Sequence, residues 1–373
     1  MAGKDIYRIV VINLGSTSTK VGFYENAAEV FTENISHSRE EVARFAEIQD
    51  QLMYRKDLVE EAFLKKGIDL DEVDIFVGNG GGMVSCLGGV YEVNDILIED
   101  CKIGRSGAHH PANLASQICR LFASEHDACC YTVNPPDIDE LMDIARPTGL
   151  SDVFRKSSFH ALNQKEIAFR YAENCGRKYE EMNLVIAHIG GGISVSAHRK
   201  GMVIDTTSAI SGNGPMMPSR AGEIDTTVIL DLVYSGKYDK DSIKNRLTRF
   251  GGLMDHLGTD DAREVEKRIT DGDKYAKVVY DAMIYQICKH IAAMCTALKG
   301  DADQIILTGG ISHSDYVTGM IRDYCGYLSG ITVMAGEYEM EALAAGALRA
   351  ARGEVETRTY TGEPMFVDFE YLK

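Results

Sequence analysis

The chain contains 373 residues, 45% of them hydrophobic, with 56 acidic and 39 basic side chains and a formal net charge of −17 at pH 7. A chain of this length can bury a sizeable core and allows two domains rather than one. The acidic balance argues against a nucleic-acid-binding protein, which needs a dense basic surface to displace counterions, so any phosphate is expected to be held locally.

Targeting and cysteine patterns point to a cytoplasmic protein. The start, MAGKDIYRIVVINLG, lacks the uninterrupted apolar core and cleavage site of a signal peptide. No stretch approaches the roughly 18 uncharged apolar residues that a membrane-spanning helix needs. The nine cysteines form no CxxC pair and no Cys/His ligand spacing, which favours reduced thiols over a metal or redox role.

Short β-branched runs alternate with longer segments of helical period, an order that predicts an α/β fold. Strands are expected at residues 9–13, 75–77, 131–133, 184–189, 305–307 and 331–334. The clearest helix is predicted over 275–298, where one face is apolar and Gly300 follows at the expected stop. A second helix is predicted over 339–351 and ends before Gly353.

Two segments 175 residues apart share one pattern. VVINLGSTSTKVGF and VIAHIGGGISVSAH each read as strand, glycine-rich turn and strand, with Asn13 aligned to His188 and Gly15 to Gly190. One interpretation is a coincidence of two glycine-rich hairpins. The other is a duplicated domain, which would place two matching hairpin tips across a cleft.

The composition of the two turns suits an anion. Glycines allow a close backbone approach, and successive N–H groups and hydroxyls then converge as donors, as expected for Gly15, Ser16, Thr17, Ser18 and Thr19 and for Gly190–Gly192. Lys20 either adds a positive charge or faces solvent. The GxxxxGK[ST] phosphate loop is absent, so a Walker-type fold is not expected.

Longer blocks carry a resemblance to a known family. VINLGSTSTK, SSFHALNQK, YEEMNLVIAHIGGGISVSAHRKGMVID, LGTDDAREVEKRI, LTGGISHS and GEYEMEALAAGALRAARGE resemble butyrate kinases of the acetate kinase family, from residue 6 to about residue 355. The resemblance implies two duplicated actin-like (ribonuclease H-like) α/β domains with an interdomain cleft. We expect domains at 1–145 and 146–338, with a helix and tail at 339–373 returning to the first.

The same resemblance implies the reaction and its participants. ATP and a short-chain carboxylic acid, butyrate or a homologue, would give ADP and an acyl phosphate by direct in-line transfer, with Mg²⁺, in a homodimeric cytoplasmic enzyme. The runner-up is a nucleotide-binding paralogue with impaired or altered transfer. An actin-like filament or chaperone ATPase is weaker, since those proteins lack the FHALNQK and SRAGEID blocks.

Site residues follow position by position from the resemblance. The expected catalytic residues are Asn13, His160 and Arg220, together with His109 or His110, between which the spacing does not decide. The first phosphate hairpin would use Gly15, Ser16, Thr17, Ser18 and Lys20, and the second His188, Gly190, Gly191, Gly192 and Ser194. The adenosine side would use Asp261, Arg263, Gly309, Gly310, Ile311 and Ser312. Glu339 would lie at Mg²⁺, with Asn13 near by.

Phosphoryl-transfer chemistry agrees with these residue types. Charge spreads over the equatorial oxygens in the transition state, where donors and cations such as His160 and Arg220 would act. A carboxylate nucleophile is already ionised and needs no strong base. Plainer interpretations stay open: His160 and His188 as structural histidines, Arg220 as an exposed loop residue, and Glu339 as a helix-dipole cap.

Two positions depart from the butyrate kinase pattern. Asn79 stands where the family carries an arginine, and Asn134 where it carries an aspartate. Because both charges are missing together, we interpret the pair as a matched change that affects rate or substrate. Substitutes could come from Lys102, Arg105, Asp137 or Asp139. The SRAGEID and HHPANL blocks are closer to acetate kinases, so acid length is open, and Met83–Leu87 and Met216–Met217 either line an acyl site or fill core.

Overall fold

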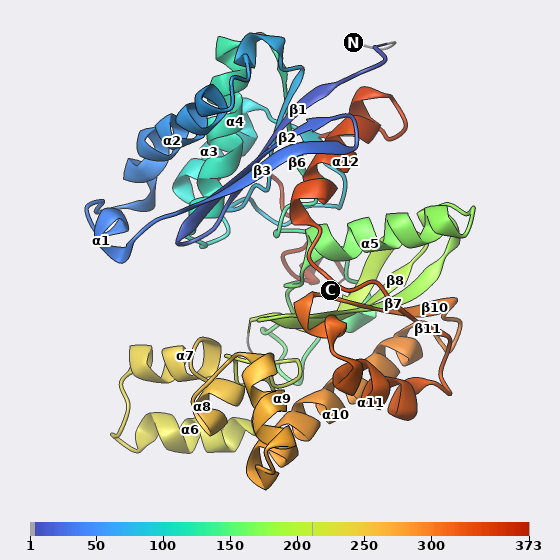
Figure 1. The fold of residues 1–373 in the computed structure, drawn as a ribbon. Helices are drawn as coiled ribbons and strands as arrows, with labels where there is room; N and C mark the ends of the chain where they lie inside the picture. Colours follow the sequence, from blue (N-terminus) through green and yellow to red (C-terminus); the bar gives the residue numbers. More distant parts are fainter. Residues whose placement is uncertain (1–3, 211, 373) are drawn as a thin grey trace. The chain divides into compact units, whose positions relative to one another are not determined.

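The computed structural model describes residues 4–210 and 212–372, which form two compact α/β units (Figure 1). Unit 1 comprises residues 1–139 and 338–373, and unit 2 comprises residues 140–337. The predicted α/β fold class is confirmed. The domain borders expected at 145/146 and 338/339 stay predictions.

Unit 1 is built on a seven-stranded mixed sheet in the order β12-β5-β6-β4-β1-β2-β3. Its strands are β1 (Arg8–Leu14), β2 (Ser18–Glu25), β3 (Ala28–Ser36), β4 (Ile75–Gly78), β5 (Val90–Glu92), β6 (Cys129–Val133) and β12 (Thr357–Thr359). The first three strands form an antiparallel meander, and β4 and β6 continue the sheet parallel to β1. β1 is buried along nearly its whole length, as expected of a central strand.

Helices cover both faces of this sheet, with α12 on the face opposite α2 and α4 (Figure 1). The helices are α1 (Arg39–Val42), α2 (Leu52–Lys65), α3 (Asp95–Ile103), α4 (Ala115–Glu125) and α12 (Glu339–Ala351), with 3-10 turns η1 (Ile48–Gln51), η2 (Leu70–Glu72), η3 (Pro111–Leu114) and η7 (Glu370–Leu372). Val10 and Ile12 share a core cluster with Val59 of α2 and Ile118 of α4. Side chains alternate along a strand, so Val11, equally buried, belongs to the face that α12 covers.

Unit 2 has a five-stranded sheet in the order β11-β10-β7-β8-β9. Its strands are β7 (Asn183–Ile189), β8 (Ile193–Arg199), β9 (Met202–Thr206), β10 (Gln304–Thr308) and β11 (Ile331–Val333). Its helices are α5 (Ala161–Asn174), α6 (Thr226–Tyr234), α7 (Lys240–Thr248), α8 (Leu253–Leu257), α9 (Ala262–Thr270), α10 (Lys274–Ala297) and α11 (Asp315–Cys325), with η4 (Asp143–Ala145), η5 (Tyr179–Glu181) and η6 (Gly310–His313). The apolar face of α10 lies in the main core cluster of this unit.

The two sheets repeat one topology. The bounds of β7 lie 175 residues after those of β1 at both ends, from 8 to 183 and from 14 to 189. In each copy three antiparallel strands are followed by two that run parallel to the first: β1-β2-β3 with β4 and β6, and β7-β8-β9 with β10 and β11. This confirms the duplication and rules out a coincidence of two hairpins.

All nine cysteines are free thiols, and most of them are buried. In the described part of the chain, no helix has both the length and the apolar character that a bilayer crossing requires.

Candidate functional site

The first glycine-rich turn joins β1 to β2. The Gly15 N–H donates to the Ser18 carbonyl at 2.9 Å and closes the turn, while Ser16 and Thr17 lie exposed at its tip. The Thr17 carbonyl accepts from the His37 N–H at 2.8 Å, which fixes the base of the turn. Lys20 lies half-buried on β2, directly across the strand pair from Asn13.

A buried arginine of α2, which no sequence motif indicated, holds this hairpin. Arg55, at 0% exposure in α2, donates from Nη1 to the Gly15 and Ser18 carbonyls at 3.2 and 3.1 Å and to Thr19 Oγ1 at 3.1 Å. Its Nε donates to Gln51 Oε1 at 3.0 Å. Within the described residues no carboxylate contacts the guanidinium, and burial lowers the Arg55 pKa. Arg55 of α2 thereby donates hydrogen bonds to the carbonyls of the turn.

His110, and not His109, contacts the first hairpin. His110 Nε2 lies 3.0 Å from Ser16 Oγ, and its Nδ1 accepts the Ala112 N–H at 3.1 Å. Because Nδ1 accepts, the ring proton of a neutral His110 is on Nε2, which donates to Ser16. His109 instead lies beside Gly104, where an added Cβ would come 3.1 Å from the imidazole.

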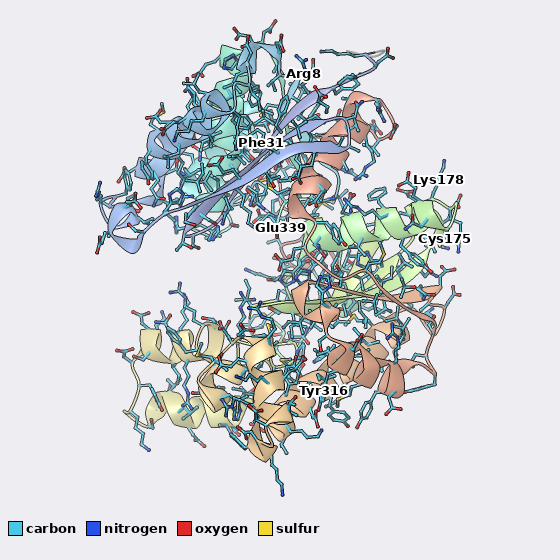
Figure 2. All side chains as sticks on the ribbon, in the orientation of Figure 1. Arg8, Phe31, Cys175, Lys178, Tyr316 and Glu339 are labelled. Carbon is cyan, nitrogen blue, oxygen red and sulfur yellow. The ribbon has the colours of Figure 1, made fainter. Side chains whose placement is uncertain are left out.

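Asn13 and Glu339, the two residues expected at Mg²⁺, contact each other in unit 1. Asn13, at the end of β1, donates from Nδ2 to Glu339 Oε2 at 2.7 Å. Glu339 is the first residue of α12 and is half-buried (Figure 2). In residues 4–210 and 212–372 no group of three or more His, Cys, Asp or Glu side chains gathers as a metal site. Mg²⁺ takes few protein ligands when nucleotide phosphates and water supply the rest, so one carboxylate beside an amide fits the ion.

The second glycine-rich turn joins β7 to β8, and the side chains of His160 and Arg220, from other segments, lie against it. The Gly190 N–H donates to the Gly192 carbonyl at 3.0 Å. A Cβ added to Gly192 would clash with Arg220 Nη1 and lie 3.0 Å from His160 Nε2, so any larger residue here would displace the Arg220 guanidinium. Arg220 Nη1 also donates to the Ala209 carbonyl. An exposed-loop role for Arg220 is therefore excluded, because its guanidinium lies against the turn.

His188 is buried and His160 is half-buried beside this turn, and the two rings stack on each other. Their ring centroids are 3.9 Å apart, with 13° between the planes. Burial lowers the pKa of His188 to about 4, and burial together with the nearby His188 and Arg220 holds the pKa of His160 well below its usual value. Both imidazoles are therefore neutral at pH 7 and act as hydrogen-bonding groups. Ser194, on β8, accepts hydrogen bonds at the base of the same turn.

The residues expected at the adenosine side lie in unit 2. Gly309, at φ +88°, approaches β7 so closely that a Cβ would fall 2.5 Å from the Ile189 carbonyl. Gly310, Ile311 and Ser312 follow in η6, where Ser312 Oγ donates to the Thr308 carbonyl at 2.7 Å. This loop therefore lies at the base of the second turn.

Asp261 and Arg263 form a local pair at the start of α9. Asp261 is the N-cap residue and accepts from Arg263 Nε and Nη2 at 3.0 and 2.8 Å. These hydrogen bonds from Arg263 lower the Asp261 pKa to about 2. The Arg263 side chain is 92% exposed. Glu266 ties α9 to the region after η6, because its Oε1 accepts from Ser314 Oγ at 2.6 Å.

The two asparagines that depart from the family pattern make separate local bonds. Asn79 Oδ1 accepts the Leu14 N–H at 3.4 Å, whereas Asn134 Oδ1 accepts the Gly89 N–H at 2.9 Å. Asn134 also has a positive φ of 42°, which asparagine tolerates better than most residues. In the described part of the chain the two amides are not hydrogen-bonded to each other.

Of the charged residues offered as substitutes, Asp137 has the most unusual surroundings. Its carboxylate accepts from the Met83 N–H and from Ser106, its Oδ2 has no partner, and burial raises its pKa to about 7. Arg105 lies 3.8 Å from Asp100. Lys102 is exposed and Asp139 is buried.

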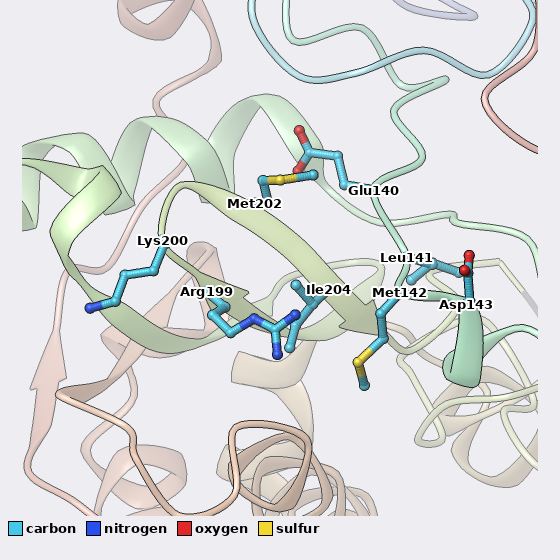
Figure 3. Close-up of a pocket in the computed structure, with 8 residues that line it drawn as sticks. All are labelled: Glu140, Leu141, Met142, Asp143, Arg199, Lys200, Met202 and Ile204. Carbon is cyan, nitrogen blue, oxygen red and sulfur yellow. The ribbon is translucent and has the colours of Figure 1, made fainter.

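The methionines named for an acyl site lie in the cores. Met83, Met216 and Met217 are each at most 7% exposed and belong to the two apolar clusters. A separate hollow of about 520 Å³ lies on unit 2, lined by residues 140–143 and by the end of β8 and by β9 (Figure 3). None of the residues expected at the site lines it.

Two duplicated α/β units, each with a glycine-rich turn between its first two strands, define an actin-like ATPase fold. Solved structures show the same fold: acetate kinase from Porphyromonas gingivalis has a TM-score of 0.72 at 17% identity, covering 92% of this chain and 99% of that one. A propionate kinase from Francisella tularensis has a TM-score of 0.71 at 18% identity, covering 91% and 98%.

Sequence relatives define the family. The model of the acetokinase family matches residues 141–333. The chain is 40% identical over 354 residues to a probable butyrate kinase of Clostridium botulinum, covering 95% of this chain and 99% of that protein. It is 38% identical over 355 residues to butyrate kinase 1 of Clostridium acetobutylicum, covering 95% and 100%. The chain belongs to the acetokinase family.

Proposed function

We propose that this protein is a carboxylate kinase that transfers a phosphoryl group reversibly between ATP and a short-chain carboxylic acid. The observation that carries the proposal is the pair His160 and Arg220, whose nitrogens both lie at Gly192 of the second turn. A module that only bound nucleotide would have no need of two donors aimed at one point. The comparisons give no support to the alternative of a binding paralogue.

The residues of unit 2 suit the transferring group. Arg220 offers a planar, always charged set of donors for phosphoryl oxygens, and a neutral His160 offers one N–H. Fixed donors of this kind stabilise charge as it spreads over the equatorial oxygens. The turn amides from Gly190 to Gly192 and the loop Gly309–Ser312 are proposed to bind the nucleotide, with Asp261 and Arg263 at the adenosine.

The residues of unit 1 suit a phosphate and its cation. Ser16, with the adjoining turn amides, offers donors, and Lys20 adds a positive charge. We assign Mg²⁺ to Glu339 with Asn13 near by, because the Asn13 amide already orients the carboxylate. When bound, the ion would neutralise phosphate charge. His110 would hold the Ser16 hydroxyl, whereas His109 has no assigned role.

The acid is proposed to be butyrate or a homologue, because the relatives are named butyrate kinases. The test is an assay of purified protein with ATP and Mg²⁺ against acetate, propionate, butyrate, isobutyrate and longer acids. Hydroxylamine would trap acyl phosphate as hydroxamate. We expect turnover with at least one acid and its loss in Arg220→Ala. Hydroxamate that forms equally in Arg220→Ala would contradict the assignment.

We also propose that the protein is a cytoplasmic homodimer, with α6 in the contact between copies. This helix has the sequence TTVILDLVY but no buried residue, and Val228, Leu230 and Val233 are 44–51% exposed. Apolar side chains exposed around one helix are typical of a protein contact. Sedimentation should show a dimer that Val233→Lys converts to a monomer. A monomeric wild-type protein would contradict this proposal.

A further inference from the structure

A chain of buried polar side chains leads to His160 from the interior of unit 2, and each distance is that of a hydrogen bond. Tyr179 Oη lies 2.7 Å from His198 Nδ1, and His198 Nε2 lies 3.1 Å from Gln164 Oε1. Gln164 Nε2 lies 2.9 Å from Ser194 Oγ, which lies 2.8 Å from His160 Nδ1. Tyr179, Gln164, Ser194 and His198 are each at most 2% exposed. Water therefore does not compete for these bonds.

The orientation of the Gln164 amide is fixed by a backbone group. Gln164 Nε2 also donates to the Ser194 carbonyl at 3.2 Å, and a carbonyl can only accept. The amide nitrogen therefore faces Ser194 and the amide oxygen faces His198. Since that oxygen can only accept, His198 Nε2 carries a proton and donates it. Burial, with the positive charge of Lys165, keeps the His198 pKa well below its usual value, so Nδ1 is free to accept from Tyr179.

Counting donors and acceptors in the same way fixes the direction in which the Ser194 hydroxyl donates. Its oxygen accepts the Gln164 Nε2–H and, at 3.3 Å, the His160 backbone N–H. Both lone pairs are then occupied, so the hydroxyl proton has to be donated, and His160 Nδ1 is the remaining partner. Nδ1 of His160 is consequently unprotonated, and the proton of its neutral ring lies on Nε2. That nitrogen is the one that faces Gly192 and Arg220.

We infer that Gln164 and His198 are positioning residues that set the tautomer of His160, so that its Nε2–H is held as a donor at the second glycine-rich turn. Every donor in the chain points the same way, from Tyr179 through His198, Gln164 and Ser194 to His160. The expected change in kcat rests on the proposed function, whereas the expected tautomer of His160 does not. It assigns a role to Gln164 and His198, which the sequence motifs did not single out.

Near-isosteric variants of Gln164 test the inference. In Gln164→Glu, an ionised carboxylate cannot donate to Ser194, so the hydroxyl turns toward residue 164 and His160 Nδ1 takes the proton. Lowering the pH protonates either the new carboxyl or His160, and both events return a proton to Nε2. The charged and titratable groups next to these side chains are Arg220 and His188 at His160, Lys165 at His198, Glu140, which pairs with Lys165 at 2.9 Å, and Glu180 near Tyr179, with Tyr179 itself at the far end. All are present in both variants and in the wild type.

Gln164→Met is the matched control, because it removes the amide without reversing the Ser194 hydroxyl. We expect kcat of Gln164→Glu at pH 8 to fall about 100-fold with KM nearly unchanged, the loss expected for one donor to a developing charge. Activity should recover as the pH is lowered. Gln164→Met should lose less kcat than Gln164→Glu, because a freed Ser194 hydroxyl leaves part of the His160 rings with Nε2–H, and it should show no such recovery. If Gln164 were needed only for folding, Gln164→Met would lose more kcat than Gln164→Glu.

A spectroscopic readout separates this inference from the proposed activity. In protein labelled with ¹⁵N-histidine, two-bond correlation spectra show which ring nitrogen is protonated, and His160→Gln identifies the His160 signals among the ten histidines. We expect Nε2–H in the wild type, a mixture of both tautomers in Gln164→Met, and Nδ1–H in Gln164→Glu at pH 8. Nδ1–H in the wild type, or no change in Gln164→Glu, would overturn the inference. A protein inactive with every acid but showing these tautomers would refute only the proposed function.

Discussion

Arg55 offers the sharpest test of how the first hairpin is held, because its guanidinium is fully buried and faces neutral acceptors only. Arg55→Met keeps most of the side-chain length but removes every donor. The Ser18 carbonyl retains the Gly15 N–H, and Thr19 Oγ1 retains His37 at 2.9 Å. The carbonyl of exposed Ser16 loses a donor at 3.4 Å that water replaces. The Gly15 carbonyl and Gln51 Oε1 lose the donors they have from Arg55.

The magnitude follows from these two acceptors. Each buried acceptor left without a donor costs about 1–3 kcal/mol, and removing a buried cation returns part of this. We expect the free energy of unfolding to fall by about 3 kcal/mol, measured by urea denaturation. Lys56→Met in the same helix is the control. Lys56 is also buried but pairs with exposed Glu125 at 2.9 Å, so its loss should cost no more than about 1 kcal/mol. Equal losses in the two variants would show that acceptors left without a donor are not what Arg55 stabilises.

Three further predictions concern the other parts of the site. The pKa of Asp137 is raised from 3.8 to about 7 in the folded state, so the folded protein binds more protons than the unfolded chain between these pH values. The stability of the wild type therefore falls as the pH rises through that window. Asp137→Asn should be more stable than the wild type at pH 8 and lose this advantage near pH 4, and parallel pH profiles of stability would contradict the prediction. Gly192→Ala should displace Arg220 and lower kcat/KM by about 100-fold. Gly191→Ala, whose Cβ meets no protein atom within 4 Å, leaves Arg220 in place and should lower kcat/KM less; equal effects would show that the close approach at Gly192 is unimportant. For the departures from the family, Asn79→Arg and Asn134→Asp should each reduce activity more than the double variant, and additive effects in the double-mutant cycle would exclude a matched change.

Local patterns in the sequence were sufficient for the central strands and the two turns. Glycine-rich turns between β-branched runs predict hairpins directly, and the predicted helix 339–351 coincides with α12. The predicted helix 275–298 is one residue out of register with α10 at each end. These elements are determined by neighbours along the chain, which is why periodicity finds them.

Contacts between distant segments could not be predicted in this way. β12 pairs with β5 across more than 250 residues, and nothing in TRT marks it as a strand. Arg55 reads as an ordinary helical arginine, because its carbonyl partners lie about 40 residues earlier. The sequence of α6 indicates a buried helix, yet within this chain it has no buried residue.

The roles of single residues could likewise not be predicted from local patterns. His160 and Arg220 were found only through the family resemblance, since an isolated histidine or arginine carries no local signal. The resemblance also could not decide between His109 and His110, because that choice depends on a one-residue shift; the bond to Ser16 distinguishes them. Gln164 and His198 were missed because their hydrogen-bond directions follow from three-dimensional contacts alone.

The proposed activity moves the γ-phosphoryl group of ATP to a carboxylate. The most direct measurement is ³¹P NMR of the protein with ATP, Mg²⁺ and butyrate, beside the same sample without acid. We predict that an acyl phosphate signal grows together with ADP and only when the acid is present. The contradicting result would be that ADP and inorganic phosphate form equally with and without butyrate, or with and without any other short-chain acid, and that no acyl phosphate signal is seen.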